Sequence, residues 1–248
     1  MRQGRRPPPR GDDDGPGWIW GTHAGLSALA NPRRTIQKVL ATRNAAMRLP
    51  EGLANLEIHD PDVLDELLPP GAVHQGLAVR AAALEALALD EACAPADGRP
   101  VIILDQLTDP QNVGAIFRSA AAFGARAIVM QDRRSPQLTG ALAKAAAGAI
   151  ELVPYVHVVN IARALSELDE MGYLTVALEG EATSSLAQVV TGADQVALVF
   201  GAEGKGLREL VARTCQAHAR IPISATMESL NVAAAAAVAL YETARGRV

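Results

Sequence analysis

Three short segments in the last 150 residues combine polar side chains with glycine and other small residues. They read NVGAIFRSAAAFGA at 112–125, LVFGAEGKGL at 198–207 and IPISATMESLNVAAAAAVALYE at 221–242. Two of them begin where an apolar run ends, which is how an α/β protein builds a ligand site from loops at the ends of its strands. An amide, a guanidinium and a carboxylate in such loops could bind a ligand and stabilise charge that develops on it.

The first segment follows Asp109 and Pro110, which predict an N-cap and a first helical residue. An apolar stripe at spacings of three and four residues predicts the helix itself. Asn112 and Arg118 do not belong to that stripe. From the residues alone, Asn112 could be a second capping group and Arg118 an ordinary exposed helix arginine.

The second segment holds the glycine-rich turn Gly201–Gly206, which directly follows a predicted strand. Glycines allow a tight turn that exposes backbone N–H and C=O groups. The turn is not a phosphate-binding P-loop, because Lys205 is followed by Gly206 rather than by Ser or Thr. Its spacing and position also differ from a dinucleotide fingerprint. Glu203 in this turn could be a solvated carboxylate or a group that faces a ligand.

In the third segment, Pro222 predicts the end of a strand, because proline cannot donate to a sheet ladder. Ser229 could cap the helix that follows. The alanine run at 233–237 would let that helix pack very closely.

The order and wording of the three segments resemble the SpoU-type RNA ribose 2′-O-methyltransferases of the SPOUT superfamily. The resemblance is close over residues 99–248 and looser over 18–80. It implies that polar side chains at matching positions lie at the reaction centre: Asn112, Arg118, Glu203, Ser229 and Asn231. It also implies that S-adenosylmethionine is bound by the turns and apolar positions Leu178, Glu179, Gly180, Gly201, Gly206, Ile221 and Leu230.

The resemblance further implies a deep trefoil knot that brings the three motifs together, which composition and periodicity could not reveal because threaded chains are rare. It implies a homodimer, with the helices at 111–123 and 229–244 as the candidate interface. No metal is expected, since the methyl group of S-adenosylmethionine is already activated and the histidines show no metal-ligand spacing.

Strands and helices are predicted to alternate from Arg99 onward. The strand candidates are Val101–Leu104, Ala127–Met130, Leu174–Leu178, Gln195–Phe200 and Arg220–Ile223, and the helix candidates are 111–123, 137–147, 160–171, 206–213 and 229–244. Continuous apolar strands separated by helix-length segments predict an α/β fold whose mostly parallel sheet carries helices on both faces.

The chain before this domain divides into three parts. Residues 1–16, rich in Arg, Pro and Asp, are predicted to be a disordered tail. Residues 17–79 predict a small α/β module that resembles the RNA-binding domain ahead of the catalytic domain in bacterial guanosine 2′-O-methyltransferases of large-subunit ribosomal RNA. Its strands are expected near 18–20, 36–41 and 77–79, and its helices at about 24–29 and 61–70. Residues 80–98 are predicted to be a linker that begins with a helix-like alanine/leucine run.

Charge is distributed unevenly along the chain. The formal net charge is −4, yet residues 1–50 hold a charge of +6 and residues 51–98 hold −9. A basic N-terminal region is compatible with phosphate contacts, and Arg33, Arg34 and Lys38 are the candidates. A charge cluster of this kind could also be only a solvated face.

Cys93 and Cys215 form no CxxC pair, which fits a reducing cytoplasm, and no apolar stretch reaches the length of a membrane span. The sequence therefore predicts a cytoplasmic enzyme that uses S-adenosylmethionine to methylate a ribose 2′-hydroxyl in RNA, with a guanosine of 23S rRNA as the expected target. A tRNA methyltransferase, a resistance-type rRNA methyltransferase and a non-catalytic RNA-binding assembly factor are the alternatives.

Overall fold

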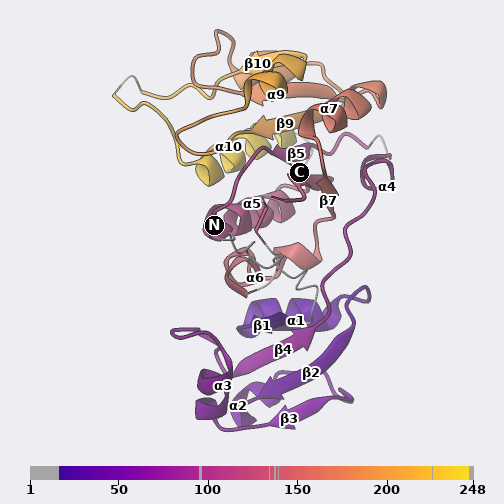
Figure 1. Ribbon diagram of the computed structural model, residues 1–248, viewed down its shortest axis with the longest axis vertical. Coiled ribbons are helices and arrows are strands. Elements are labelled where there is room, and N and C mark those ends of the chain that lie inside the picture. The colour runs from indigo at the N-terminus through magenta and orange to yellow at the C-terminus, as the bar shows by residue number, and fades with distance from the viewer. Residues whose placement is uncertain are drawn as a thin grey trace, which may run out of the picture.

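The computed structural model describes residues 17–94, 97–133, 135–136, 138, 140–224 and 226–245. The tail predicted over 1–16 lies outside these residues. Figure 1 shows two sheets at opposite ends of the long axis, with α1 and α6 between them.

The larger sheet has six strands in the order β10-β8-β9-β5-β6-β7, and every pair in it is parallel. The strands are β5 (Val101–Leu104), β6 (Ala127–Gln131), β7 (Tyr155–Val158), β8 (Leu174–Leu178), β9 (Val196–Phe200) and β10 (Ala217–Ala219). The predicted parallel sheet is confirmed. The sequence did not predict β7, and the strand expected at Arg220–Ile223 is wrong, because the edge strand ends at Ala219.

Side chains alternate across this sheet and build a core on each face. Ile102 and Leu104 of β5 join the core that contains α5 (Pro110–Ala122), α6 (Gly140–Ala146), the 3₁₀ turn η1 (Ala149–Glu151), α8 (Leu186–Val190) and α10 (Val232–Ala244). Val101 and Ile103 join the core that contains α4 (Leu89–Cys93), α7 (Ile161–Glu170) and α9 (Glu209–Thr214). The strands are apolar on both faces because helices cover both.

The smaller sheet has the order β1-β4-β2-β3, with β4 antiparallel to both of its neighbours and β2 parallel to β3. Its strands are β1 (Gly17–Trp20), β2 (Ile36–Ala41), β3 (Leu56–Ile58) and β4 (Leu77–Ala81), and its helices are α1 (Thr22–Ala30), α2 (Arg43–Ala46) and α3 (Pro61–Leu67). The predicted α/β character of this module is confirmed. The sequence did not predict β3 or α2.

The first half of the predicted linker is extended backbone rather than helix. Ala81 still pairs with both β1 and β2, and the next segment continues with Ala82 N–H donating to Thr35 O and Leu87 N–H donating to Tyr155 O. The helix expected at the start of 80–98 is therefore wrong. The helix in this segment begins only at Leu89.

The two sheets share one continuous apolar core, in which Ile19 and Leu77 of the smaller sheet cluster with Ile102 of the larger one. A buried ion pair crosses the same junction. The Nη2 atom of Arg34 lies 2.8 Å from Oε1 of Glu151, and the two side chains are 1% and 5% exposed. The prediction that Arg34 contacts RNA phosphates is therefore wrong, because its guanidinium is buried and pairs with the Glu151 carboxylate.

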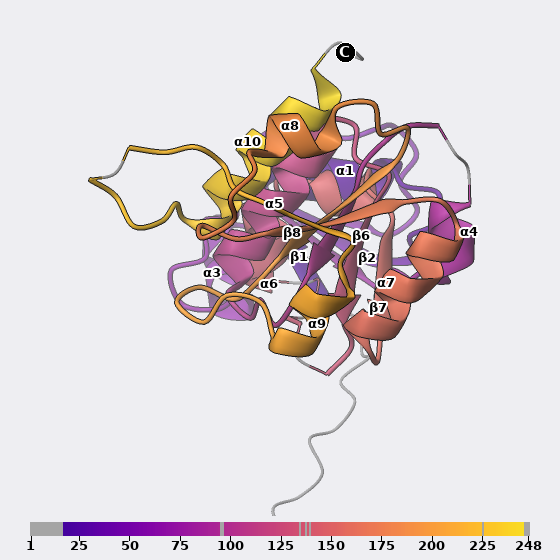
Figure 2. The ribbon, with the colours of Figure 1, turned by 90° about the horizontal axis from the view of Figure 1, so that it is seen from above.

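Helix α10 returns along α5, and residues 221–224 and 226–231, which precede it, extend away from the sheet (Figure 2). The C-terminal helix thus brings the third motif to the helix that carries the first. This arrangement agrees with the threaded chain that the resemblance implies.

Candidate functional site

Three polar side chains, one from each motif, form a closed hydrogen-bonded triangle. Asn112 Nδ2 donates to Glu203 Oε1 at 3.1 Å. Asn231 Nδ2 donates to the same Glu203 oxygen at 2.8 Å and to Asn112 Oδ1 at 3.0 Å. Residues separated by as many as 119 positions in the sequence therefore meet at one point. We call these three residues the triad.

The start of α5 places Asn112. The Asp109 side chain accepts hydrogen bonds from the backbone N–H groups of Gln111 and Asn112, and Pro110 occupies the first turn, as predicted. Gly114 lets α5 press against α6, since a Cβ atom there would lie 2.5 Å from the Cβ of Ala145. The first turn of α5 is thus fixed by its cap and by close packing.

The glycine-rich turn places Glu203. Ala202 and Gly206 exchange backbone hydrogen bonds of 3.1 and 2.8 Å, which close the turn on itself. A Cβ atom on Gly201 would lie 2.2 Å from the carbonyl carbon of Gly206, so only glycine permits this closure. Gly201 and Gly206 therefore shape the turn, and the exposed side chain of Glu203 stands at its tip.

Asn231 is the N-cap of α10. Its Oδ1 atom accepts hydrogen bonds from the N–H groups of Ala233 and Ala234 at 3.0 and 3.3 Å. The cap that the sequence suggested for Ser229 is wrong, because the helix begins at Val232, two residues later than that cap would require. One amide thus both starts α10 and supplies two donors to the triad.

The segments expected to bind the cofactor also face one another. A Cβ atom on Gly180 would have Glu228 O as its nearest neighbour at 3.9 Å, so the turn after β8 lies beside the third motif. Ile223, Met227 and Leu230 on that segment are 40%, 62% and 38% exposed. Small-molecule sites combine apolar side chains with a few polar groups, and these two segments offer both.

Glu179, in the turn after β8, contacts His218 of the edge strand, with Oε2 lying 2.6 Å from Nδ1. Its backbone N–H donates to Ala219 O. Ile221, by contrast, is half-buried and packs against the main core. The residues predicted to bind the cofactor therefore lie in three segments: the turn after β8, the glycine-rich turn after β9, and the third motif.

Arg118 and Ser229 do not join the triad. Arg118 lies on α5, six residues after Asn112 and so about 9 Å further along the helix axis. Its side chain is exposed and has no hydrogen-bond or ion-pair partner among the residues that the structure describes. Ser229 is likewise exposed on the third motif.

A buried ion pair that the sequence did not single out supports the glycine-rich turn. Asp105, at the end of β5, is 1% exposed and receives Arg208 Nη2 at 2.6 Å, Arg208 Nε at 2.9 Å and the Arg208 backbone N–H at 3.1 Å. Arg208 lies two residues after the turn, so the pair ties the turn to the central strand. An aspartate that ends a fully apolar strand was the available signal in the sequence.

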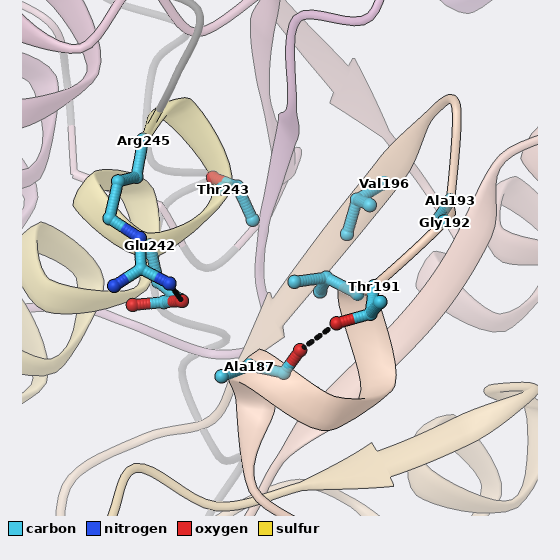
Figure 3. Close-up of a pocket in the computed structure, with 9 residues that line it drawn as sticks. Ala187, Thr191, Gly192, Ala193, Val196, Glu242, Thr243 and Arg245 are labelled. Carbon is cyan, nitrogen blue, oxygen red and sulfur yellow. Dashed lines mark hydrogen bonds and ion pairs between the residues drawn. The ribbon is translucent and has the colours of Figure 1, made fainter.

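A hollow of about 290 Å³ lies elsewhere, between the end of α8, the start of β9 and the end of α10 (Figure 3). Its lining includes Val196, the first residue of β9, whereas the glycine-rich turn follows the last residue of that strand. Glu242 and Arg245 in its wall pair with each other at 3.0 Å. This hollow is therefore remote from the triad.

The other basic residues predicted to contact RNA lie in the smaller module. Arg33 is exposed, although its Nη2 donates to the carbonyl oxygen of Glu85 at 3.0 Å. Lys38 Nζ lies 3.0 Å from Glu57 Oε2 on a partly exposed surface. The hydrogen bond from His59 and, after it, this contact from Lys38 lower the pKa of the Glu57 carboxyl.

Comparisons with protein families match both parts of the chain. The SpoU rRNA Methylase family matches residues 99–241, and the family described as RNA 2′-O ribose methyltransferase substrate binding matches residues 18–87. Among the described residues, no helix is both long and apolar enough to cross a membrane.

Individual relatives agree with these matches. A protein of Vibrio cholerae named 23S rRNA (guanosine-2′-O-)-methyltransferase RlmB is 36% identical over 245 residues, which cover 93% of this chain and 97% of that protein. A Ralstonia nicotianae protein of the same name is 42% identical over 179 residues, 70% of each chain.

Solved structures show the same fold. The SpoU methyltransferase AviRb from Streptomyces viridochromogenes, in complex with the cofactor AdoMet, superposes with a TM-score of 0.78 at 21% identity over 93% of this chain and 89% of its own. An AdoMet-bound rRNA methyltransferase from Sinorhizobium meliloti gives a TM-score of 0.79 at 22% identity over 94% and 88% of the two chains.

Proposed function

Since the chain belongs to the SpoU rRNA methylase family, we propose that it methylates the ribose 2′-oxygen of a guanosine in 23S rRNA, with S-adenosylmethionine as the methyl donor. The chain is an RNA 2′-O-methyltransferase by its family and its relatives. The observation that carries the proposal for this site is the triad, because it joins one side chain from each of three distant motifs.

The triad holds the Glu203 carboxylate in a position from which it can accept a hydrogen bond from a hydroxyl group. Two amide donors hold Oε1, while Oε2 has no hydrogen-bond partner among the described residues. A carboxylate oxygen fixed in this way can accept a hydrogen bond from a substrate hydroxyl. We assign Glu203 that role and assign Asn112 and Asn231 the role of holding it in place.

Arg118 is proposed to act on the other side of the reacting oxygen. Helical side chains tilt toward the N-terminus of their helix, which is the end of α5 that carries Asn112. A guanidinium hardly deprotonates in proteins, so it would not serve as a free base. It can instead stabilise the developing alkoxide and hold the neighbouring phosphate. Ser229 is proposed as a polar contact in the same centre.

The residues around the triad fit S-adenosylmethionine. Apolar contacts would come from Ile221, Leu230 and Leu178, and backbone contacts from Glu179, Gly180 and the turn between Gly201 and Gly206. When bound, the cofactor supplies a methyl group activated by its sulfonium, so we keep the expectation that no metal takes part. The protein's own task is to align the ribose oxygen with that methyl group.

We further propose that the enzyme works as a homodimer through the segments at 111–123 and 229–244. Val238 and Tyr241 on α10 are 43% and 54% exposed, and Tyr241 stacks edge-on against Phe123 at the end of α5. Large exposed apolar side chains on one helix face support an interface there. Analytical ultracentrifugation tests this part, since a monomer at all concentrations would contradict it.

The remaining parts of the proposal concern the substrate. Residues 17–79 would bind the RNA, residues 99–248 would carry out the transfer, and 80–98 would connect them. The match of residues 18–87 to the family described as RNA 2′-O ribose methyltransferase substrate binding supports this division. A cytoplasmic location follows from the ribosomal substrate.

The experiment that tests the proposal combines the purified protein, methyl-labelled S-adenosylmethionine, and either 23S rRNA, 16S rRNA or bulk tRNA. We expect label only in 23S rRNA, at the ribose of one guanosine, and calorimetric binding of S-adenosylmethionine but not of NAD. Label in tRNA would show that the substrate is tRNA rather than 23S rRNA. Cofactor binding without label in any RNA, whether naked or in ribosomal particles, would favour a non-catalytic assembly factor.

A further inference from the structure

The smaller module contains a hollow of about 430 Å³ that is separate from the triad. It lies between the segment at 42–48 and the turn at 72–76, and it is lined by Thr42, Asn44, Ala45, Arg48, Pro61, Ala72, Val73, His74, Gln75 and Gly76. Its volume falls in the range of about 300–1,000 Å³ that is common for small-molecule pockets. In Figure 1, α2 and α3 lie at the opposite end of the long axis from α10 and β9.

The turn that forms one wall is rigidly held. Gln75 Oε1 accepts a hydrogen bond from Thr22 N–H at 3.0 Å, and His74 Nδ1 accepts one from Gly76 N–H at 3.0 Å. Gln75 adopts a φ of 52°, which is uncommon for a non-glycine residue. Such strain tends to persist at functional sites, where the surrounding contacts enforce it.

Gly76 also brings the two walls together. Its φ is +81°, and a Cβ atom there would lie 2.4 Å from Thr42 Oγ1. Its carbonyl oxygen accepts a hydrogen bond from Thr42 N–H at 2.8 Å. The protein's own backbone contacts therefore hold the two walls of the hollow together.

Free hydrogen-bonding groups line the opposite wall. Asn44 and Arg48 are exposed, and neither side chain has a hydrogen-bond or ion-pair partner among the residues that the structure describes. Arg43 beside them is exposed and unpaired in the same sense. The amide offers donors and an acceptor, and the guanidinium offers a planar fork of donors that suits phosphate or a base edge.

The surrounding charge limits what this wall can bind. Asp65 of α3 lies 3.2 Å from His74 Nε2, and Asp62 and Glu66 stand on the same helix. A duplex presents continuous phosphate charge, which these carboxylates would repel. A single nucleotide requires a cation at one point only, and Arg48 supplies it. Sequence-specific proteins also bind RNA mostly through unpaired bases.

We propose that this hollow binds one unpaired nucleotide of the RNA substrate, with its base against the wall at 72–76 and its phosphate at Arg48. The inference rests on the proposed function, because it assumes an RNA substrate. The hollow then selects RNAs that present an unpaired nucleotide at a fixed separation from the methylated ribose.

Binding of two labelled RNAs to the full-length protein tests the proposal by fluorescence anisotropy. One RNA is a hairpin with an unpaired loop, and the other is a fully paired duplex of the same length. The variants are Asn44→Ala and Arg48→Ala, and the control is Arg163→Ala, which removes an exposed positive charge from α7. We expect the two hollow variants to raise the hairpin Kd about tenfold, the size of one good base or phosphate contact. The duplex Kd should change less than twofold.

The same variants are then assayed for methyl transfer to 23S rRNA. We expect a higher KM for RNA with an unchanged kcat and unchanged affinity for S-adenosylmethionine. An unchanged hairpin Kd, or equal weakening of hairpin and duplex, would overturn the nucleotide site while methylation by the wild type upholds the proposed function. If the variants lose hairpin binding selectively but the wild-type protein methylates no RNA, the nucleotide site is supported and the proposed function is overturned. No binding of either RNA by the wild type would overturn the site.

Discussion

Arg34 and Glu151 form an ion pair across the junction of the two sheets, and only 1% and 5% of their side chains reach solvent. Arg34 Nη1 also donates to Ala82 O at 2.8 Å, and Glu151 Oε2 accepts from Asn31 Nδ2 at 2.6 Å. Gly148 brings α1 close beside this pair, because a Cβ atom there would lie 2.2 Å from Ser27 Oγ. The junction is thus fixed by satisfied polar groups as well as by apolar packing.

Breaking this pair should strongly destabilise the protein. Glu151→Ala leaves a buried guanidinium without its counter-charge, which typically costs about 3–5 kcal/mol of unfolding free energy. Urea denaturation followed by circular dichroism measures the loss. Replacing both residues, as Arg34→Met with Glu151→Leu, should restore most of it. Arg163→Ala breaks an exposed pair and should cost no more than about 0.5 kcal/mol. Equal losses from the buried and exposed variants would contradict this account.

The ion pair between Asp105 and Arg208 should control cofactor affinity. Asp105→Asn preserves shape but removes the charge that holds Arg208 after the glycine-rich turn, so we expect the Kd for S-adenosylmethionine to rise about tenfold or more. Arg208→Lys should behave similarly, because lysine lacks the planar fork that bonds both carboxylate oxygens. Calorimetry provides the readout. Unchanged affinity in both variants would show that the turn holds its shape without this pair.

The ion pairs Arg34–Glu151 and Asp105–Arg208 show what the sequence could not predict about the fold. Apolar periodicity correctly predicted β5 and β8, which are buried on both faces, and the Asp109–Pro110 signature correctly placed the start of α5. Apolar periodicity did not identify Arg34 as buried, because the ion-pair partner of Arg34 lies 117 residues away in the sequence. Burial of a charge depends on tertiary packing, which local patterns do not encode.

The edges of the sheets were missed for a related reason. The edge strand β10 holds Ala217, His218 and Ala219, which have little apolar signal, so the more apolar stretch after it was favoured. Strand β7 begins directly after Pro154 and contains the polar His157. At the site, the resemblance brought Asn112, Glu203 and Asn231 together, whereas the residues alone left Asn112 and Glu203 with ordinary alternatives and did not single out Asn231. The hydrogen bonds that join them emerge only in the folded chain.

Within the triad, the variant Asn231→Asp tests the role of Asn231 as N-cap of α10 separately from its role as hydrogen-bond donor to Glu203. Aspartate is as good an N-cap as asparagine, so α10 and the melting temperature should be preserved. Its carboxylate, however, would meet Glu203 Oε1 where a donor now lies at 2.8 Å. We expect kcat to fall about a hundredfold or more, the size associated with one lost catalytic donor. Adding Glu203→Gln restores a donor and acceptor pair at this contact, but full turnover should not return, because the carboxylate assigned to the substrate hydroxyl is then absent. Full activity of Asn231→Asp would rule out the role given to the triad.

Arg118→Ala should lower turnover by orders of magnitude and leave the affinity for S-adenosylmethionine near normal. The side chain is exposed and unpaired among the described residues, so its removal should not disturb folding. Single-turnover methylation of 23S rRNA measures the first effect and calorimetry the second. Arg118→Lys tests whether the planar fork matters, since lysine keeps the charge alone. Near wild-type turnover of Arg118→Ala would refute the proposed stabilisation of the alkoxide.

The two cysteines should be inert in the native protein and reactive after unfolding. Burial raises the pKa of Cys93 to about 11 and that of Cys215 to about 12, and the side chains are 1% and 7% exposed. Only the thiolate reacts, so a chromogenic disulfide reagent at pH 8 should modify neither thiol in the native state and both in urea. Because the folded pKa values are raised, the stabilisation from keeping these thiols neutral is complete below about pH 8.5, the pKa of a free thiol. It should decline as the pH rises toward the folded values. Rapid modification of the native protein at pH 8 would show that these thiols are not enclosed as described.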